Sequence, residues 1–79
     1  VMGDHEEAVK NYRMVLDQIP QDYDVRFKLA ISLLALGRRQ EAISELSTLA
    51  SSESIGPDER RWLERHIAAL KAEEQKSKL

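Results

Sequence analysis

Residues 22–50, DYDVRFKLAISLLALGRRQEAISELSTLA, decide the fold, because their small and apolar positions recur at an offset of 34 residues on either side. Gly37 repeats Gly3, and Ala42 repeats Ala8. The same register also pairs Val9 with Ile43, Tyr12 with Leu46, Val15 with Leu49, Leu16 with Ala50, Leu29 with Leu63, Leu33 with Ile67, and Leu36 with Leu70. A fixed period of this length is typical of stacked helical hairpins, an architecture that usually holds a partner.

Composition excludes several classes of protein. The 79 residues suffice for one small domain, and the absence of cysteine excludes disulfides and thiolate metal sites. A formal charge of −2, with both signs interleaved, gives no general attraction to nucleic acid. The apolar run at residues 33–36 is far shorter than the roughly 20 residues of a membrane span, and no secretory leader is visible. A cytoplasmic protein is therefore expected, although Val1 in place of an initiator methionine indicates a fragment that leaves room for a targeting segment.

Start and stop signals predict four helices, at residues 4–19, 22–36, 39–50 and 57–76. Asp4 and Glu7 have the spacing of a capping box, and Pro20 ends the first helix. Gly37 suits the residue that follows the end of the second helix. The short connection through Gly37 and Arg38 then makes the second and third helices antiparallel.

The apolar positions assign a buried face to each predicted helix. In the first helix that face comprises Ala8, Val9, Tyr12, Val15, Leu16 and Ile19. The second helix has two apolar stripes, one of Val25, Leu29, Leu33 and Leu36, the other of Phe27, Ile31 and Leu34. Two stripes indicate an interior helix with neighbours on both sides. The third helix repeats the face of the first, and the fourth carries Leu63, Ile67 and Leu70.

The period, together with Ala8, Tyr12 and Pro20 in one unit and Ala42 and Leu46 in the next, resembles the tetratricopeptide repeat. Family positions in the first helix of the complete repeat hold Arg26, Leu29, Ala30 and Leu33. The resemblance covers residues 3–70. It implies an all-α fold of four helices, stacked as antiparallel hairpins in a short right-handed solenoid. Its parts would be the second helix of a first repeat at 4–19, a full repeat at 22–50 and a capping helix at 57–76.

Two departures from the family pattern bear on the end of the array. Ser54 stands where the second unit would carry proline, so the loop before the last helix is not expected to be a standard repeat junction. Glu64 is the period-mate of Ala30, a position kept small because a neighbouring helix crosses closely there. Since burying a glutamate at such a crossing is costly, Glu64 is expected to be exposed and the fourth helix to be a C-terminal cap. The start within a repeat predicts that the N-terminal end is cut.

The resemblance also implies a concave groove lined by the first helix of each repeat. Its positions fall on Asp24, Phe27, Lys28, Ile31, Leu34, Ala35, Asp58, Arg61, Trp62, Arg65, Ala68 and Ala69. The residues predicted to bind a partner are Phe27, Lys28, Ile31, Arg61, Trp62 and Arg65, since aromatic and guanidinium groups dominate interface hot spots. The alternative is that Phe27, Ile31, Leu34 and Trp62 only pack helices together. Trp62 lies off the Leu63–Ile67–Leu70 stripe, so the main core does not account for it.

Family members that hold a C-terminal carboxylate line the groove with lysine, asparagine and arginine. At those positions this chain has Phe27, Ile31, Asp58 and Trp62, so such a clamp is not expected.

No catalytic site is predicted. His5 and His66 lack ligand spacing, no nucleophile sits beside a base, and no glycine-rich phosphate loop is present. Acidic neighbours offset the basic residues Arg60, Arg61 and Arg65. The sequence therefore predicts a non-enzymatic protein-interaction module without cofactor, metal, nucleic-acid or membrane partner, which docks a peptide or partner domain in the groove.

Two alternatives stay open at this point. One is a self-associating scaffold, in which a second copy covers Ala8, Tyr12 and Leu16 on the first helix. The other is a non-catalytic segment of a larger multidomain protein.

Overall fold

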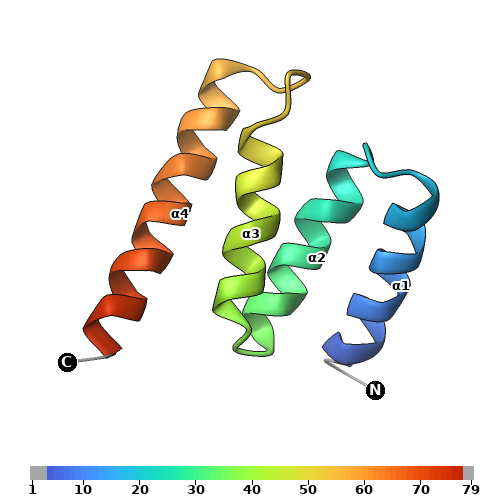
Figure 1. Cartoon of the computed structure of the whole chain (residues 1–79), viewed down its shortest axis with the longest axis horizontal. Coiled ribbons are helices and arrows are strands. Elements are labelled where there is room, and N and C mark those ends of the chain that lie inside the picture. The colour runs from blue at the N-terminus through green and yellow to red at the C-terminus, as the bar shows by residue number, and fades with distance from the viewer. Residues whose placement is uncertain (1–3, 78–79) are drawn as a thin grey trace.

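The computed structural model describes residues 4–77, which form four α-helices and no strand. They are α1 (His5–Gln18), α2 (Tyr23–Ala35), α3 (Arg39–Ala50) and α4 (Pro57–Ser77). The helices stand side by side in chain order, and each one packs against the next (Figure 1). The predicted all-α fold of stacked antiparallel hairpins is confirmed. Gly3, the first residue of the 34-residue pairing, lies outside the described residues.

Aspartate side chains cap the starts of α1 and α2. Asp4 Oδ1 accepts a hydrogen bond from the backbone N–H of Glu7 at 3.1 Å, as the capping-box spacing predicts. Asp22 Oδ1 accepts in the same way from the N–H of Val25, also at 3.1 Å. Each cap satisfies a backbone donor that has no partner inside its helix.

The turn between α2 and α3 depends on Gly37, whose φ of 77° lies in the left-handed region. The N–H of Gly37 donates to the carbonyl of Leu34 at 3.0 Å, and the N–H of Arg38 donates to that of Leu33 at 2.8 Å. This pair of bonds is the Schellman motif, which satisfies the last carbonyls of α2 and reverses the chain.

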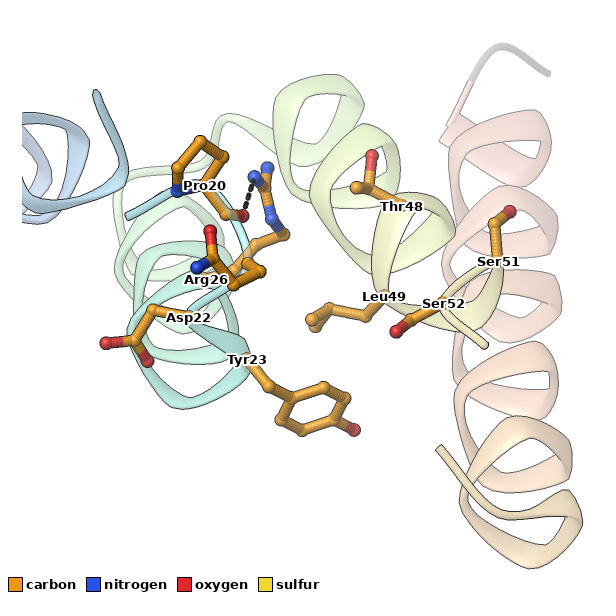
Figure 2. A pocket seen from close by; sticks show the side chains of 9 residues that line it. Pro20, Asp22, Tyr23, Arg26, Thr48, Leu49, Ser51 and Ser52 are labelled. Carbon is orange, nitrogen blue, oxygen red and sulfur yellow. Dashed lines mark hydrogen bonds between the residues drawn. The ribbon is translucent and has the colours of Figure 1, made fainter. Parts of the chain in front are cut away.

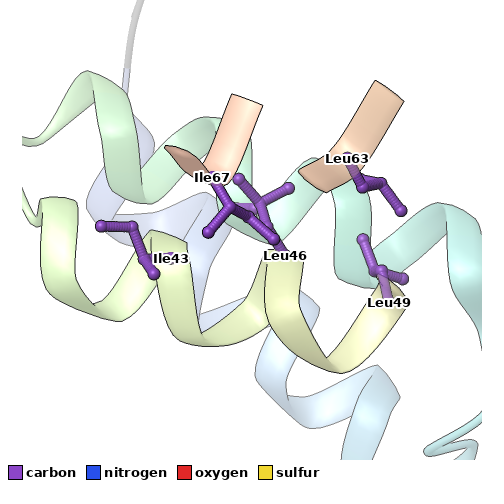
Figure 3. Packing of buried hydrophobic residues seen from close by; sticks show 6 residues of the cluster. Ile43, Leu46, Leu49, Leu63 and Ile67 are labelled. Carbon is purple, nitrogen blue, oxygen red and sulfur yellow. The ribbon is translucent and has the colours of Figure 1, made fainter. Parts of the chain in front are cut away.

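The core consists of two clusters of buried residues. The first joins α1, α2 and α3 through Val9, Leu16, Leu29, Leu33 and Ala42. The second joins α2, α3 and α4 through Ala30, Ile43, Leu46, Leu49, Leu63 and Ile67, most of which are visible in Figure 3. The two inner helices therefore bury two faces, as the two stripes of α2 predict, whereas α1 and α4 each bury one.

Ala30 and Glu64 occupy equivalent repeat positions but differ in burial. Ala30 is fully buried where α2 meets α3 and α4, whereas Glu64 is exposed on α4. The predicted exposure of Glu64 is confirmed.

The buried face of α1 is narrower than predicted. Val15 is 37% exposed and Ile19 is 46% exposed, although the pattern placed both on that face. The reason is that the backbone of α1 lies close to that of α2 alone, and Val9 and Leu16 face that side. Leu49, the period-mate of Val15, is only 3% exposed because α3 has a helix on each side.

The sequence also predicted that Ala8, Tyr12 and Leu16 form an uncovered face of α1, and this prediction is wrong for Leu16. Leu16 is buried against α2, so it needs no further cover, and Ala8 and Tyr12 are half-buried. The apolar side chains of α1 that reach water are instead Met14, Val15 and Ile19.

Two arginines tie the loops to the helices. Arg26 pairs with Glu45 of α3 at 2.6 Å and donates to the carbonyl of Pro20 at 2.9 Å. Arg60 donates to the carbonyls of Ala50 and Ser52 at 2.9 and 3.0 Å, which caps the end of α3. Arg60 is thus a structural residue.

Candidate functional site

An apolar hollow of about 240 Å³ lies between α2 and α4, with the buried Leu46 of α3 among its walls. We call it the α2–α4 groove. Its lining residues are Phe27, Ile31, Leu34, Leu46, Trp62, His66, Ala69, Leu70 and Glu73. Ile31 is 47% exposed and Trp62 is 46% exposed, so large apolar surfaces at this groove remain in water.

Aromatic side chains bridge α2 and α4, whose backbones do not pack directly against each other. The rings of Phe27 and Trp62 have centroids 5.8 Å apart and are inclined at 51°. The Trp62 indole also lies against the imidazole of His66, with centroids 3.9 Å apart and planes 30° apart. His66 Nδ1 is 3.0 Å from the Trp62 carbonyl oxygen, which fixes the imidazole beside the indole. Such ring pairs hold Trp62 in place, although the residue remains 46% exposed.

The six predicted partner-binding residues fall into three groups. Phe27, Ile31 and Trp62 come together in the α2–α4 groove. Lys28 instead lines a hollow of about 570 Å³ between α1 and α2, to which Phe27 and Ile31 also contribute. Arg61 and Arg65 line a third hollow of about 230 Å³ with Trp62 and Asp58, on the outer side of the indole.

Two of the groove residues also pack the helices together, which was the alternative role considered for them. Phe27 is half-buried and packs against the second core cluster as well as against Trp62. Leu34 is half-buried against the first cluster while it lines the groove. Ile31 and Trp62, by contrast, are 47% and 46% exposed, so packing inside the fold accounts for only part of each side chain.

Tyr23 and His66 belong to the same surface, although the sequence reasoning did not select them. Tyr23 lines a hollow of about 190 Å³ with Phe27, Glu59 and Trp62. Burial, followed by a hydrogen bond to the Glu59 carboxylate, raises the pKa of the Tyr23 hydroxyl above its ordinary 10.0. Helical spacing could have found both residues, since Tyr23 precedes Phe27 by four positions and His66 follows Trp62 by four.

A further hollow, of about 220 Å³, lies beside the loop between α1 and α2 (Figure 2). Arg26 borders it, and the guanidinium is held by Glu45 and the Pro20 carbonyl. Asp22 borders it too, but its carboxylate caps α2. The charged side chains of Asp22 and Arg26 here stabilise the fold.

No cluster of three or more metal-ligating side chains occurs within residues 4–77. Among the helices of that same segment, none has the length and hydropathy that crossing a membrane requires.

Comparison with known proteins identifies the family of this chain. A family model, the tetratricopeptide repeat, matches residues 2–54, which is more than half of the chain and includes α1, α2 and α3. The chain belongs to the tetratricopeptide repeat family. No curated protein and no solved structure matches it.

Tetratricopeptide repeats generally bind other proteins and are typically non-catalytic. Helix α4 lies outside the matched segment. The wall of the groove that carries Trp62 therefore lies outside the matched segment.

Proposed function

We propose that this tetratricopeptide repeat domain docks a segment of a partner protein in the α2–α4 groove. The observation that carries the proposal is the half exposure of Trp62 and Ile31 at the edge of an apolar hollow. Aromatic and aliphatic surface that stays in water at a concave site gains free energy when a partner covers it.

The groove suits one apolar anchor of the partner segment. A volume of about 240 Å³ accepts an aliphatic or aromatic side chain against Leu46, with Trp62 and Ile31 on either side. Burying such a side chain contributes about 1.5 to 3 kcal/mol. Because the ring contacts with Phe27 and His66 already hold Trp62, little side-chain entropy is lost on binding.

The test uses peptides selected from a random library on the immobilised 79-residue chain. We expect the selected peptides to bind Ile31→Ala and Trp62→Ala more weakly than the wild type. The matched control is Ile19→Ala on α1, because Ile19 is 46% exposed and Ile31 is 47% exposed. Equal binding to Ile31→Ala and Ile19→Ala would exclude the groove, as would a library from which no peptide is enriched.

Self-association is the second candidate function. It is favoured by the exposed apolar side chains of α1, where Met14 is 65% exposed and Ile19 is 46% exposed. A second copy that covered these residues would make the mass in solution depend on concentration. Sedimentation of the wild type and of Ile19→Glu tests this, and a monomer mass at all concentrations would eliminate it.

A further inference from the structure

Two arginines flank the exposed side of Trp62. Arg61 and Arg65 are one helical turn apart on α4, and both are exposed. They line the hollow of about 230 Å³ that meets the α2–α4 groove at the indole. Within residues 4–77 neither guanidinium forms an ion pair or a hydrogen bond. Two unpaired cations therefore stand next to the proposed docking site.

Most carboxylates around the groove are already engaged. Glu59 accepts a hydrogen bond from the Tyr23 hydroxyl, and Glu73 pairs with Arg39 at 3.8 Å. Asp4, which lines the hollow between α1 and α2, caps the first helix. These three carboxylates stabilise the fold, and within the described residues only that of Glu73 is paired with a cation.

Asp58 is the carboxylate that lines the same hollow as the two arginines, whereas the exposed Glu64, next to Arg65 in the sequence, does not line it. Asp58 lies in the first turn of α4, where the positive end of the helix dipole offsets part of its charge. With Arg61 and Arg65 it leaves the hollow with an excess of one positive charge. Lys28, beyond Phe27, adds another cation that has no ion pair among the described residues. The positive excess is confined to the hollow beside Trp62, because Glu59, Glu73 and Asp4 line the neighbouring hollows.

We propose that the segment docked in the α2–α4 groove is acidic, and that two of its carboxylates pair with Arg61 and Arg65 while an apolar side chain enters beside Trp62. This inference rests on the proposed function and specifies the chemistry of the partner. Guanidinium and carboxylate groups match as two parallel N–H···O bonds.

The spacing of the arginines sets the spacing of the partner's carboxylates. Residues four apart on a helix have Cβ atoms about 6 Å apart. Carboxylates one turn apart on a helical partner have this separation, and so do those on alternate residues of an extended one, where two residues span about 6.6 Å. The partner's apolar anchor then lies to one side of its acidic pair, because Trp62 lies between the arginines and the groove.

The experiment sequences the peptides that the random library yields on the wild-type chain and measures their affinities through Trp62, the only tryptophan. Enrichment of an apolar residue together with two acidic residues is expected. Replacing both arginines (Arg61→Gln with Arg65→Gln) should lower the affinity about 2- to 30-fold, and added salt should weaken wild-type binding. Asp58→Asn should act in the opposite direction and strengthen binding. All three side chains are exposed, so circular dichroism should show an unchanged fold.

The outcomes separate this inference from the proposed function. Apolar peptides without acidic residues that bind the double arginine variant as well as the wild type, yet lose affinity for Ile31→Ala, would overturn the acidic partner and leave the groove intact. Peptides that bind Ile31→Ala as tightly as the wild type would contradict docking in the groove, and the acidic partner with it. A library without enriched peptides contradicts both.

Discussion

Replacing Leu63 with alanine is expected to release α4 before the other helices unfold. Leu63 is fully buried, and it packs α4 onto α3 together with Ile67, Leu46 and Leu49 (Figure 3). The backbone of α4 packs against α3 alone. Because a stack of helices is held by neighbour contacts, the loss falls on this one interface.

The expected loss is a large share of the total stability. A buried leucine truncated to alanine costs about 2 to 5 kcal/mol. A domain of 79 residues has an unfolding free energy of about 4 to 12 kcal/mol, at about 0.05 to 0.15 kcal/mol per residue. The variant should therefore populate a state in which α1, α2 and α3 stay packed while α4 is detached.

Two probes of urea unfolding distinguish this state from global unfolding. Trp62 is on α4 and contacts Phe27 of α2, so its fluorescence reports the docking of α4. Far-ultraviolet circular dichroism reports all four helices. In Leu63→Ala the fluorescence transition should come at lower urea than the dichroism transition, and amide exchange should speed up mainly in residues 57–77.

Leu29→Ala is the matched control, because Leu29 is the period-mate of Leu63 and is 1% exposed. Leu29 lies in the first cluster, which holds α1 to α2 and α3, so its truncation should loosen α1. The fluorescence transition of this variant should then come at higher urea than the dichroism transition. Coincident transitions in both variants, with equal loss of exchange protection in every helix, would refute the reasoning. The domain would then unfold as one unit.

Three further predictions test other parts of the fold. Because the pKa of Tyr23 is raised above 10.0 by burial and a nearby carboxylate, the stability it confers is complete below pH 10.0 and is lost as the pH rises through the folded-state value. As the pH rises above that value, the free energy of unfolding measured in urea titrations should therefore fall less for Tyr23→Phe than for the wild type. Gly37→Ala should lower the free energy of unfolding by about 1 to 2 kcal/mol because of the φ of 77°, since an added Cβ meets no atom within 4 Å. Gly56 is equally open but has no positive φ, so Gly56→Ala should change the urea midpoint much less. Arg26→Ala and Glu45→Ala should show a coupling of about 1 to 2 kcal/mol in a double-mutant cycle, because their side chains are 19% and 16% exposed, and purely additive losses would contradict it.

The fold followed closely from local patterns. The cap at Asp4, the turn at Gly37 and the burial of Leu63 and Ile67 all agree with predictions made from spacing alone. Each depends on interactions within a helix or between adjacent helices, and helical periodicity encodes those directly. The exposure of Glu64 was predictable for the same reason.

The candidate site was predictable only in part. Resemblance to the family selected Phe27, Ile31 and Trp62, which the structure does bring together. It could not show that Lys28 lies on one side of them and Arg61 on the other, because α2 and α4 are joined only through α3 and their side chains. The distance between non-adjacent helices depends on the packing of everything between them.

By itself, the sequence determined four helices in a row, their antiparallel order and the period that relates them, since these arise from local geometry and short connections. Only the tertiary structure decided which equivalent positions become buried. Val15 and Leu49 are period-mates, yet one is 37% exposed and the other 3%, because a helix covers α3 on both sides and α1 on one. In the same way, the half exposure of Trp62 follows from how far α4 stands from α2, and no pattern within α4 encodes that distance.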